Sequence, residues 1–119
     1  MAHKQLLALI DDLNAQGMYG YLHEHPGMTR VECMKHPPDA NGIYRGVCFW
    51  MAVVGGHAFI GSFLYRQWLI PDHVNLIDLA VSWFQSDADC GEPNAETIKT
   101  FGLEEYSDEE FQAIDDVVS

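Results

Sequence analysis

The sequence predicts a single α+β domain over residues 1–119, with an antiparallel sheet of three to four strands and helices packed on it. A chain of 119 residues fits one domain, because domains most often contain about 100–150 residues. Of these residues 48% are hydrophobic, which is enough for a core without metals or disulfides. Apolar residues recur at helical spacing near both ends of the chain, whereas its centre is rich in β-branched and aromatic residues.

The N-terminal third predicts one helix and at least one strand. Residues 3–15 form the helix, and Gly17 follows where a left-handed residue often ends a helix. The apolar stripe of this helix consists of Leu6, Leu9, Ile10 and Leu13. Residues 18–25 fit either a strand or a loop. Alternating side chains over residues 28–35 predict a short, half-buried strand.

The centre of the chain is a run of twenty residues without a formal charge, from Gly46 to Tyr65. Its length would suit a membrane-spanning helix, but its aromatic and β-branched composition does not. The pair Gly55-Gly56 between two apolar runs is typical of a two-residue hairpin turn. We therefore predict a β-hairpin with strands at about 43–54 and 57–68, around which the sheet is built.

The hairpin turn sets a register in which the numbers of paired residues sum to 111. Trp50 then lies opposite Gly61, and Tyr65 opposite Gly46. Aromatic side chains that cover cross-strand glycines stabilise such strands, so both pairs favour this register. Both faces of the hairpin are apolar near the turn, as expected of central strands that are covered on both sides.

One pair in this register is unfavourable. It sets Arg45 against Arg66, and like charges directly opposite each other destabilise a sheet.

The last part of the chain predicts helices that pack on the sheet. One begins at Asp72 and ends near Gln85, and a short one capped by Asn94 ends before Gly102. Ser107 and Glu110 have the spacing of a capping box at the start of a last helix. Residues 86–119 thus form an acidic, helical third of the chain.

Charge is the strongest compositional signal. Six Lys and Arg residues face eighteen Asp and Glu residues, for a net charge of −12. Residues 86–119 carry −10 of this charge, with eleven acids and one base. Such a charge disfavours direct contact with nucleic-acid phosphates or an anionic membrane and favours a basic partner. The alternative is that the acidic residues only keep the protein soluble.

The cysteines and histidines predict neither a metal site nor a catalytic dyad. His23, His25, Cys33 and His36 are the candidate metal ligands, but their spacing matches no standard zinc pattern. Cys48 and His57 are too far apart in the hairpin, about 20 Å, to form a Cys–His pair. We therefore expect no catalytic residue, no metal and no cofactor.

The cysteine content also bears on location. An odd number of cysteines, three, favours free thiols in a reducing compartment. We see no secretory signal and expect a cytoplasmic protein.

These observations favour a non-enzymatic binding or inhibitory protein that occludes a basic surface of a toxin, nuclease or nucleic-acid-handling complex. Immunity, anti-restriction and phage inhibitor proteins share its small size and acidic charge. The expected partner-binding residues are Asp87, Asp89, Glu104, Glu105, Asp108, Glu109, Asp115 and Asp116. The alternative is a small enzyme or ligand-binding domain with a pocket between the sheet and the helix over residues 72–85. The sequence leaves the oligomeric state open.

Overall fold

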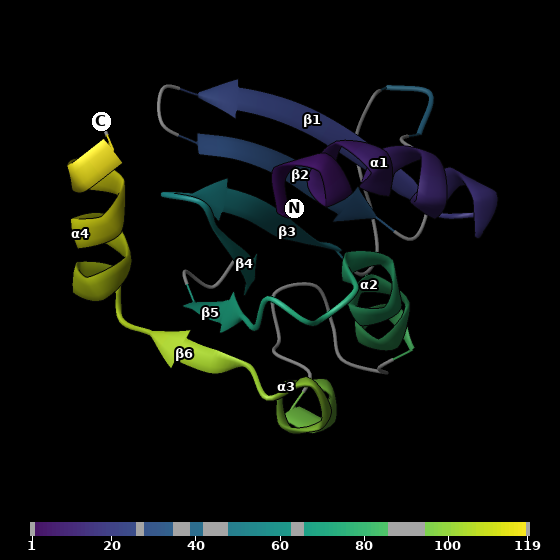
Figure 1. Ribbon diagram of the computed structural model, residues 1–119. Coiled ribbons are helices and arrows are strands. Elements are labelled where there is room, and N and C mark those ends of the chain that lie inside the picture. The colour runs from purple at the N-terminus through teal and green to yellow at the C-terminus, as the bar shows by residue number, and fades with distance from the viewer. Residues whose placement is uncertain are drawn as a thin grey trace.

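The computed structural model describes residues 2–25, 28–34, 39–41, 48–62, 66–85 and 95–118 (Figure 1). Within these residues the chain forms four helices and six strands. In chain order these are α1 (Ala2–Ala15), β1 (Tyr19–His25), β2 (Met28–Met34), β3 (Cys48–Val54), β4 (His57–Ser62), β5 (Arg66–Ile70), α2 (Leu76–Phe84), α3 (Ala95–Phe101), β6 (Glu104–Tyr106) and α4 (Asp108–Val118). The predicted α+β layout is confirmed.

The six strands form one antiparallel sheet in the order β1-β2-β3-β4-β5-β6, so each strand pairs with the next one in the chain. The prediction of three to four strands was therefore wrong. The predicted strand over 57–68 is two strands, because β5 turns back and pairs antiparallel with β4. The additional edge strand β6 lies in a segment that we had predicted to be helical.

The predicted register of the central hairpin is confirmed. Val54 pairs with His57 and Trp50 with Gly61. Gly55 and Gly56 have φ angles of 59° and 80°, as a tight hairpin turn between twisted strands requires. The indole of Trp50 lies directly on Gly61, where an added Cβ would overlap the ring.

The predicted opposition of Arg45 and Arg66 was wrong. Arg66 lies in β5 and pairs with Ser62 of β4, so β4 separates it from β3. Arg45, and the predicted pair of Gly46 with Tyr65, lie outside the described residues.

One face of the sheet carries the main core, beneath α1 and α2. The buried apolar side chains of α1 meet Phe49, Met51 and Ile60 of the central strands. The α1 residues in this core are Leu6, Leu9 and Leu13, all fully buried. Leu76, Trp83 and Phe84 belong to α2.

Helix α2 begins later than predicted. Its N-cap is Asn75, whose Oδ1 accepts hydrogen bonds from the backbone N–H groups of Ile77 and Asp78 at 3.1 and 3.3 Å. The preceding residues form a turn instead, in which the Val74 N–H donates to the Pro71 carbonyl at 3.0 Å. Asp72 therefore precedes the helix and does not cap it.

The opposite face carries a smaller, mainly aromatic cluster beneath α4. Trp50, Val54 and Phe59 are buried there. Phe111 of α4 packs against Trp50 and Phe59, with ring centroids 5.9 and 5.1 Å apart. Figure 1 shows α4 on the side of the molecule opposite α1 and α2. The prediction that β3 and β4 are central and covered on both sides is thus confirmed.

None of the helices in the described part of the chain is both long enough and apolar enough to cross a membrane.

Candidate functional site

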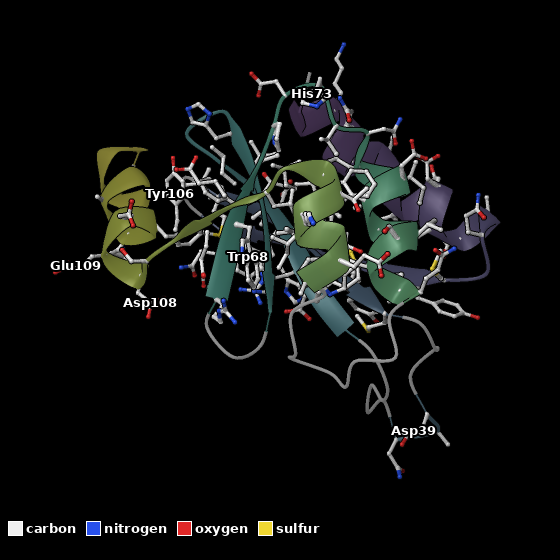
Figure 2. All side chains as sticks on the ribbon, turned by 90° about the horizontal axis from the view of Figure 1, so that it is seen from below. Asp39, Trp68, His73, Tyr106, Asp108 and Glu109 are labelled. Atoms are coloured by element: carbon white, nitrogen blue, oxygen red, sulfur yellow. The ribbon has the colours of Figure 1, made fainter. Side chains whose placement is uncertain are left out.

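The most strongly charged part of the described structure is the unit of β6 and α4. Residues 104–118 contain seven acidic residues and no Lys or Arg. We define the acidic surface as Glu104, Glu105, Asp108 and Glu109, which are all exposed. Figure 2 shows the side chains of Asp108 and Glu109 pointing outward from α4. Neighbouring residues of a strand point to opposite faces, so Glu104 lies on the face covered by α4 and Glu105 on the face covered by α1 and α2. The four carboxylates therefore lie around the β6 edge of the sheet and do not all share one face.

A buried glutamine fixes the junction between β6 and α4. Gln67 of β5 pairs with Tyr106 of β6, and only 5% of its surface is exposed. Its amide nitrogen donates a hydrogen bond to the Tyr106 carbonyl and lies 3.4 Å from Asp108 Oδ1. Because a buried amide needs hydrogen-bond partners, Gln67 holds the first residue of α4 in a defined place.

The start of α4 is fixed further by the predicted capping box. The Ser107 hydroxyl accepts a hydrogen bond from the Glu110 N–H, and the Glu110 carboxylate accepts one from the Ser107 N–H, both at 3.1 Å. The carboxylate of Glu110 is therefore used within the fold. Negative charges at this end also interact favourably with the helix dipole, which explains part of the acidic content of the first turn.

Glu105 is the one member of the acidic surface that is paired with a cation of the described residues. Arg66 of β5 donates two hydrogen bonds to its carboxylate, at 2.7 and 2.9 Å. The guanidinium also lies 5.1 Å from the ring centre of Trp68. The hydrogen bond from Arg66 lowers the pKa of Glu105 and raises the pKa of Arg66. No Lys or Arg of the described residues forms an ion pair with the other three carboxylates of the surface.

Half of the predicted partner-binding residues, Glu104, Glu105, Asp108 and Glu109, belong to the acidic surface around the β6 edge. Asp115 and Asp116 lie in α4, two helical turns further on, and their side chains are outside the described part. Asp87 and Asp89 lie in a segment that is also outside it.

The sequence did not identify Arg66 and Gln67 as supports of this surface. Each reaches β6 or α4 across about 40 positions of the chain, 39 for the Arg66–Glu105 and Gln67–Tyr106 contacts. No local pattern signals such a contact. An isolated Arg at the end of an apolar run was the only available sign.

The candidate metal ligands do not converge. His23 and Cys33 are on opposite faces of the β1–β2 pair, because His23 pairs with Arg30 and Cys33 with Gly20. His23 Nε2 lies 3.6 Å from Glu32, whereas Cys33 is buried in the core, where desolvation raises its pKa. Within the described residues no group of three His, Cys, Asp or Glu side chains could hold a metal ion.

The other candidates for chemistry are His25, His36 and the Cys48–His57 pair. The side chain of His25, and all of His36, lie outside the described part. In β3, Cys48 pairs with Met34, six positions along the strand from Val54, the partner of His57. This register separates Cys48 from His57 by the predicted distance of about 20 Å.

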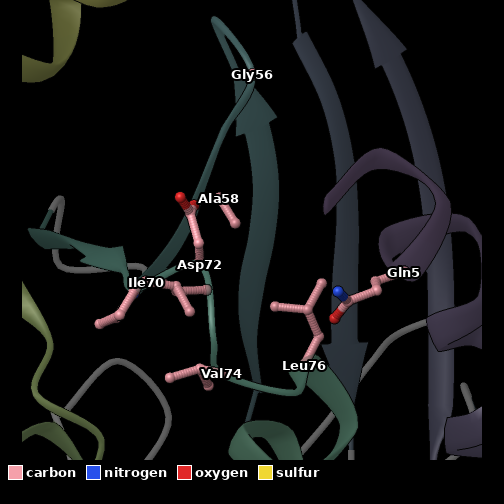
Figure 3. A pocket seen from close by; sticks show the side chains of 8 residues that line it. Gln5, Gly56, Ala58, Ile70, Asp72, Val74 and Leu76 are labelled. Carbon is pink, nitrogen blue, oxygen red and sulfur yellow. The ribbon is translucent and has the colours of Figure 1, made fainter. Parts of the chain in front are cut away.

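A pocket of about 430 Å³ opens on the helix-covered face (Figure 3). It lies between α1, the paired residues Ala58 and Ile70, and the segment that leads into α2. Val74 and Leu76 add to its apolar wall, while Gln5 and Asp72 supply an amide and a carboxylate. Figure 3 shows these two polar side chains on opposite sides of the pocket. The arrangement suits a small apolar group that carries a cationic or hydrogen-bond-donating end.

The chain was compared with known proteins at three levels. No protein-family model, no curated protein and no solved structure matches it.

Proposed function

We propose that the protein is a non-enzymatic binding protein that uses its acidic surface to occlude a basic surface of a partner protein. The observation that carries this proposal is the unit of residues 104–118, which holds seven acids and no base. The carboxylates of the acidic surface are exposed, and Gln67, Ser107 and Phe111 fix the elements that present them. A fixed arrangement of charges binds with a smaller entropic cost than a flexible tail.

The charge of this surface defines the chemistry of the partner. Clustered carboxylates repel one another, and a surface rich in Lys and Arg relieves that repulsion and raises the association rate by orders of magnitude. Basic surfaces of this kind occur on proteins that handle nucleic acids. The proposed partner is accordingly a toxin, a nuclease or another nucleic-acid-handling complex, and direct binding of nucleic acid is disfavoured.

We also propose that the protein acts in the cytoplasm. The chain has three cysteines, and Cys33 is a free thiol buried in the core. A reducing compartment suits such thiols.

The test is capture of the partner from a cell extract by three forms of the protein. These are the unmodified chain, the variant Glu104→Lys/Glu109→Lys and the control Asp11→Lys/Asp12→Lys. Both variants change the net charge equally, but Asp11 and Asp12 are exposed on α1, on the other side of the sheet. We expect the unmodified chain and the control to retain one basic protein in stoichiometric amount, and the Glu104/Glu109 variant to lose it.

Two results would contradict the proposal. Retention of the same partner by all three forms would mean that the acidic surface only aids solubility. Equal loss with both variants would mean that net charge, and not this surface, governs binding.

A second candidate function is supported by the pocket. A volume of about 430 Å³ with an apolar wall, the Gln5 amide and the Asp72 carboxylate fits a small-molecule site. Matched fragments test this function: phenethylamine should shift the NMR signals of Ala58 and Ile70, and phenylacetate should not. Asp72→Asn should abolish that discrimination. Equal shifts with both fragments, or none, would remove this candidate.

A further inference from the structure

The outer edge of β1 is unlike the edge formed by β6. Strand β1 has seven residues, Tyr19–His25, with Glu24 as its only acidic residue and no Lys, Arg or Pro. Proteins usually protect an open edge with short strands, charges or prolines. Strand β6 follows this pattern, since it has three residues and two of them are Glu. Strand β1 is longer and has one charged residue, Glu24, as its only such protection.

The register of the sheet determines which backbone groups of β1 point outward. The pair that flanks a two-residue turn exchanges both hydrogen bonds, and the pattern then alternates along the strands. Val54 and His57 are such a pair, because they flank the Gly55-Gly56 turn. When this alternation is followed across β3 and β2, it assigns Tyr19, Tyr21, His23 and His25 to hydrogen bonds with β2. The N–H and C=O groups of Gly20, Leu22 and Glu24 therefore point away from the sheet.

These three outward residues are symmetric about the middle of the strand. If two copies of β1 pair antiparallel around a two-fold axis at Leu22, the numbers of paired residues sum to 44. Leu22 then meets Leu22 of the second copy, and Gly20 meets Glu24 of the second copy. All three outward residues on each strand find a hydrogen-bonded partner, for about six hydrogen bonds in total.

Apolar side chains accompany this edge. The exposed large hydrophobic residues of the described chain are Leu7, Tyr21 and Leu22, with 43%, 49% and 40% of their surfaces exposed. All three lie on β1 or on α1, which packs against β1. In the two-fold register Tyr21 faces His23 of the second copy, while Leu22 is on the face covered by α1.

The distribution of charge also favours β1, and not β6, as the edge at which a second copy pairs. The first 85 residues carry a net charge of only −2, with seven acids and five bases. The acidic surface lies beside β6, at the opposite end of the sheet. Pairing through β1 keeps the two acidic surfaces far apart, whereas pairing through β6 would oppose Glu104 and Glu105 to the same residues of another copy.

We propose that the protein forms a two-fold symmetric dimer through β1, in which the sheet continues from one copy into the next. This inference does not depend on the proposed function. The first test is light scattering after size-exclusion chromatography over a range of protein concentrations. The unmodified protein should have twice the mass of the chain and should dissociate on dilution.

The variant Leu22→Lys sets two cations against each other on the two-fold axis and removes two leucines that the dimer would bury. We expect its dimer dissociation constant to rise about 100-fold. Thr100→Lys is the matched control, because it adds the same charge at an exposed position of α3 and should leave the dimer intact. Circular dichroism and thermal melting establish that both variants are folded.

Amide hydrogen exchange on the unmodified protein tests the register without any substitution. In the dimer the Leu22 amide should be protected along with those of Tyr21 and His23, and its protection should fall on dilution. A monomer at every concentration would overturn the proposal, including the case in which β1 pairs only with another protein. A dimer with a rapidly exchanging Leu22 amide, or one unaffected by Leu22→Lys, would overturn it as well.

Discussion

The two faces of the sheet are covered in different ways. The first face lies beneath α1 and α2, whose buried side chains, such as Leu9 and Trp83, form one large core with Phe49. The second face lies beneath α4, which contacts it through Phe111 on Trp50 and Phe59. The first face therefore supplies most of the hydrophobic stabilisation, because that scales with buried apolar area.

The difference between the faces separates stability from the display of charge. Most of the acidic surface belongs to the thinly covered side, where a few aromatic contacts and hydrogen bonds determine the position of α4. Glu105 is the exception, because it lies on the face of Trp68. Substitutions in the large core should weaken the whole fold. Substitutions beneath α4 should also displace the acidic surface.

Replacing Trp50 by Ala should lower the free energy of unfolding by about 3–5 kcal/mol, as expected for a buried aromatic residue. Trp50 is 8% exposed, and its ring supports Phe111 of α4. Phe49→Ala, on the other face, should have a comparable cost. Chemical denaturation measures both, and amide exchange in α4 should accelerate only with Trp50→Ala. Equal acceleration in the two variants would remove the contrast between the faces.

Replacing Gly61 by Ala should cost about 1–3 kcal/mol, because the new Cβ would overlap the Trp50 indole. A double-mutant cycle isolates this contact. In the Trp50→Ala background the same Gly61→Ala change should cost almost nothing, since the ring is gone. A cost that is the same in both backgrounds would mean that the strand backbone, and not the indole, requires glycine.

Replacing Phe111 by Ala should cost about 1–2 kcal/mol, because Phe111 is only partly buried. The main core should persist, while α4 loses its contact with Phe59. NMR signals of α4 should move toward those of an unpacked segment, and those of Leu9 should not. Glu109→Gln is the control and should change stability by no more than about 0.5 kcal/mol. Global unfolding of Phe111→Ala would contradict the division between the faces.

The Arg66–Glu105 pair should have the smallest effect, about 0.5 kcal/mol or less, because both side chains are nearly half exposed and water screens them. The pKa of Glu105 is lowered by folding from its ordinary value of 4.5. The stability that this pair contributes is therefore complete above the ordinary pKa of Glu105, and it is lost as the pH falls through the lowered pKa. Thermal melting between neutral and acidic pH should show a slightly smaller acid sensitivity in Glu105→Gln. Glu104→Gln, which removes an acid with no such pair, should not reproduce it.

The sequence predicted those parts of the fold whose signals are local. Gly55-Gly56 fixed the turn, and Trp50 opposite Gly61 fixed the register of the central hairpin. The spacing of Ser107 and Glu110 predicted the start of α4. Each of these features depends on residues that lie close together in the chain or in one hairpin.

The parts that were missed depend on distant pairing. Strand β6 has Glu at two of its three positions, so its strand state comes from pairing with β5 and not from its own composition. The break between β4 and β5 falls between Ser62 and Arg66, where the sequence has neither Gly nor Pro to indicate a turn. Asp72 and Asn75 are both favourable N-cap residues. The turn in which the Val74 N–H bonds to the Pro71 carbonyl includes Asp72, so the helix begins only after Asn75.

The same division applies to the candidate site. Composition alone identified the acidic residues of 104–109. It could not show that Glu105 is partly neutralised by Arg66 or that Gln67 connects β6 to α4. These contacts decide which carboxylates are available to a partner.

The most direct test of the proposed docking role is the association rate with the captured partner, measured at increasing ionic strength. For the unmodified protein and for Asp11→Lys/Asp12→Lys, the rate should be high at low salt and fall steeply, because salt screens charges beyond about 10 Å at 0.1 M. For Glu104→Lys/Glu109→Lys the rate should be lower at low salt and nearly independent of it. Identical rates and identical salt dependence in all three proteins would contradict the assignment of the acidic surface as the docking surface.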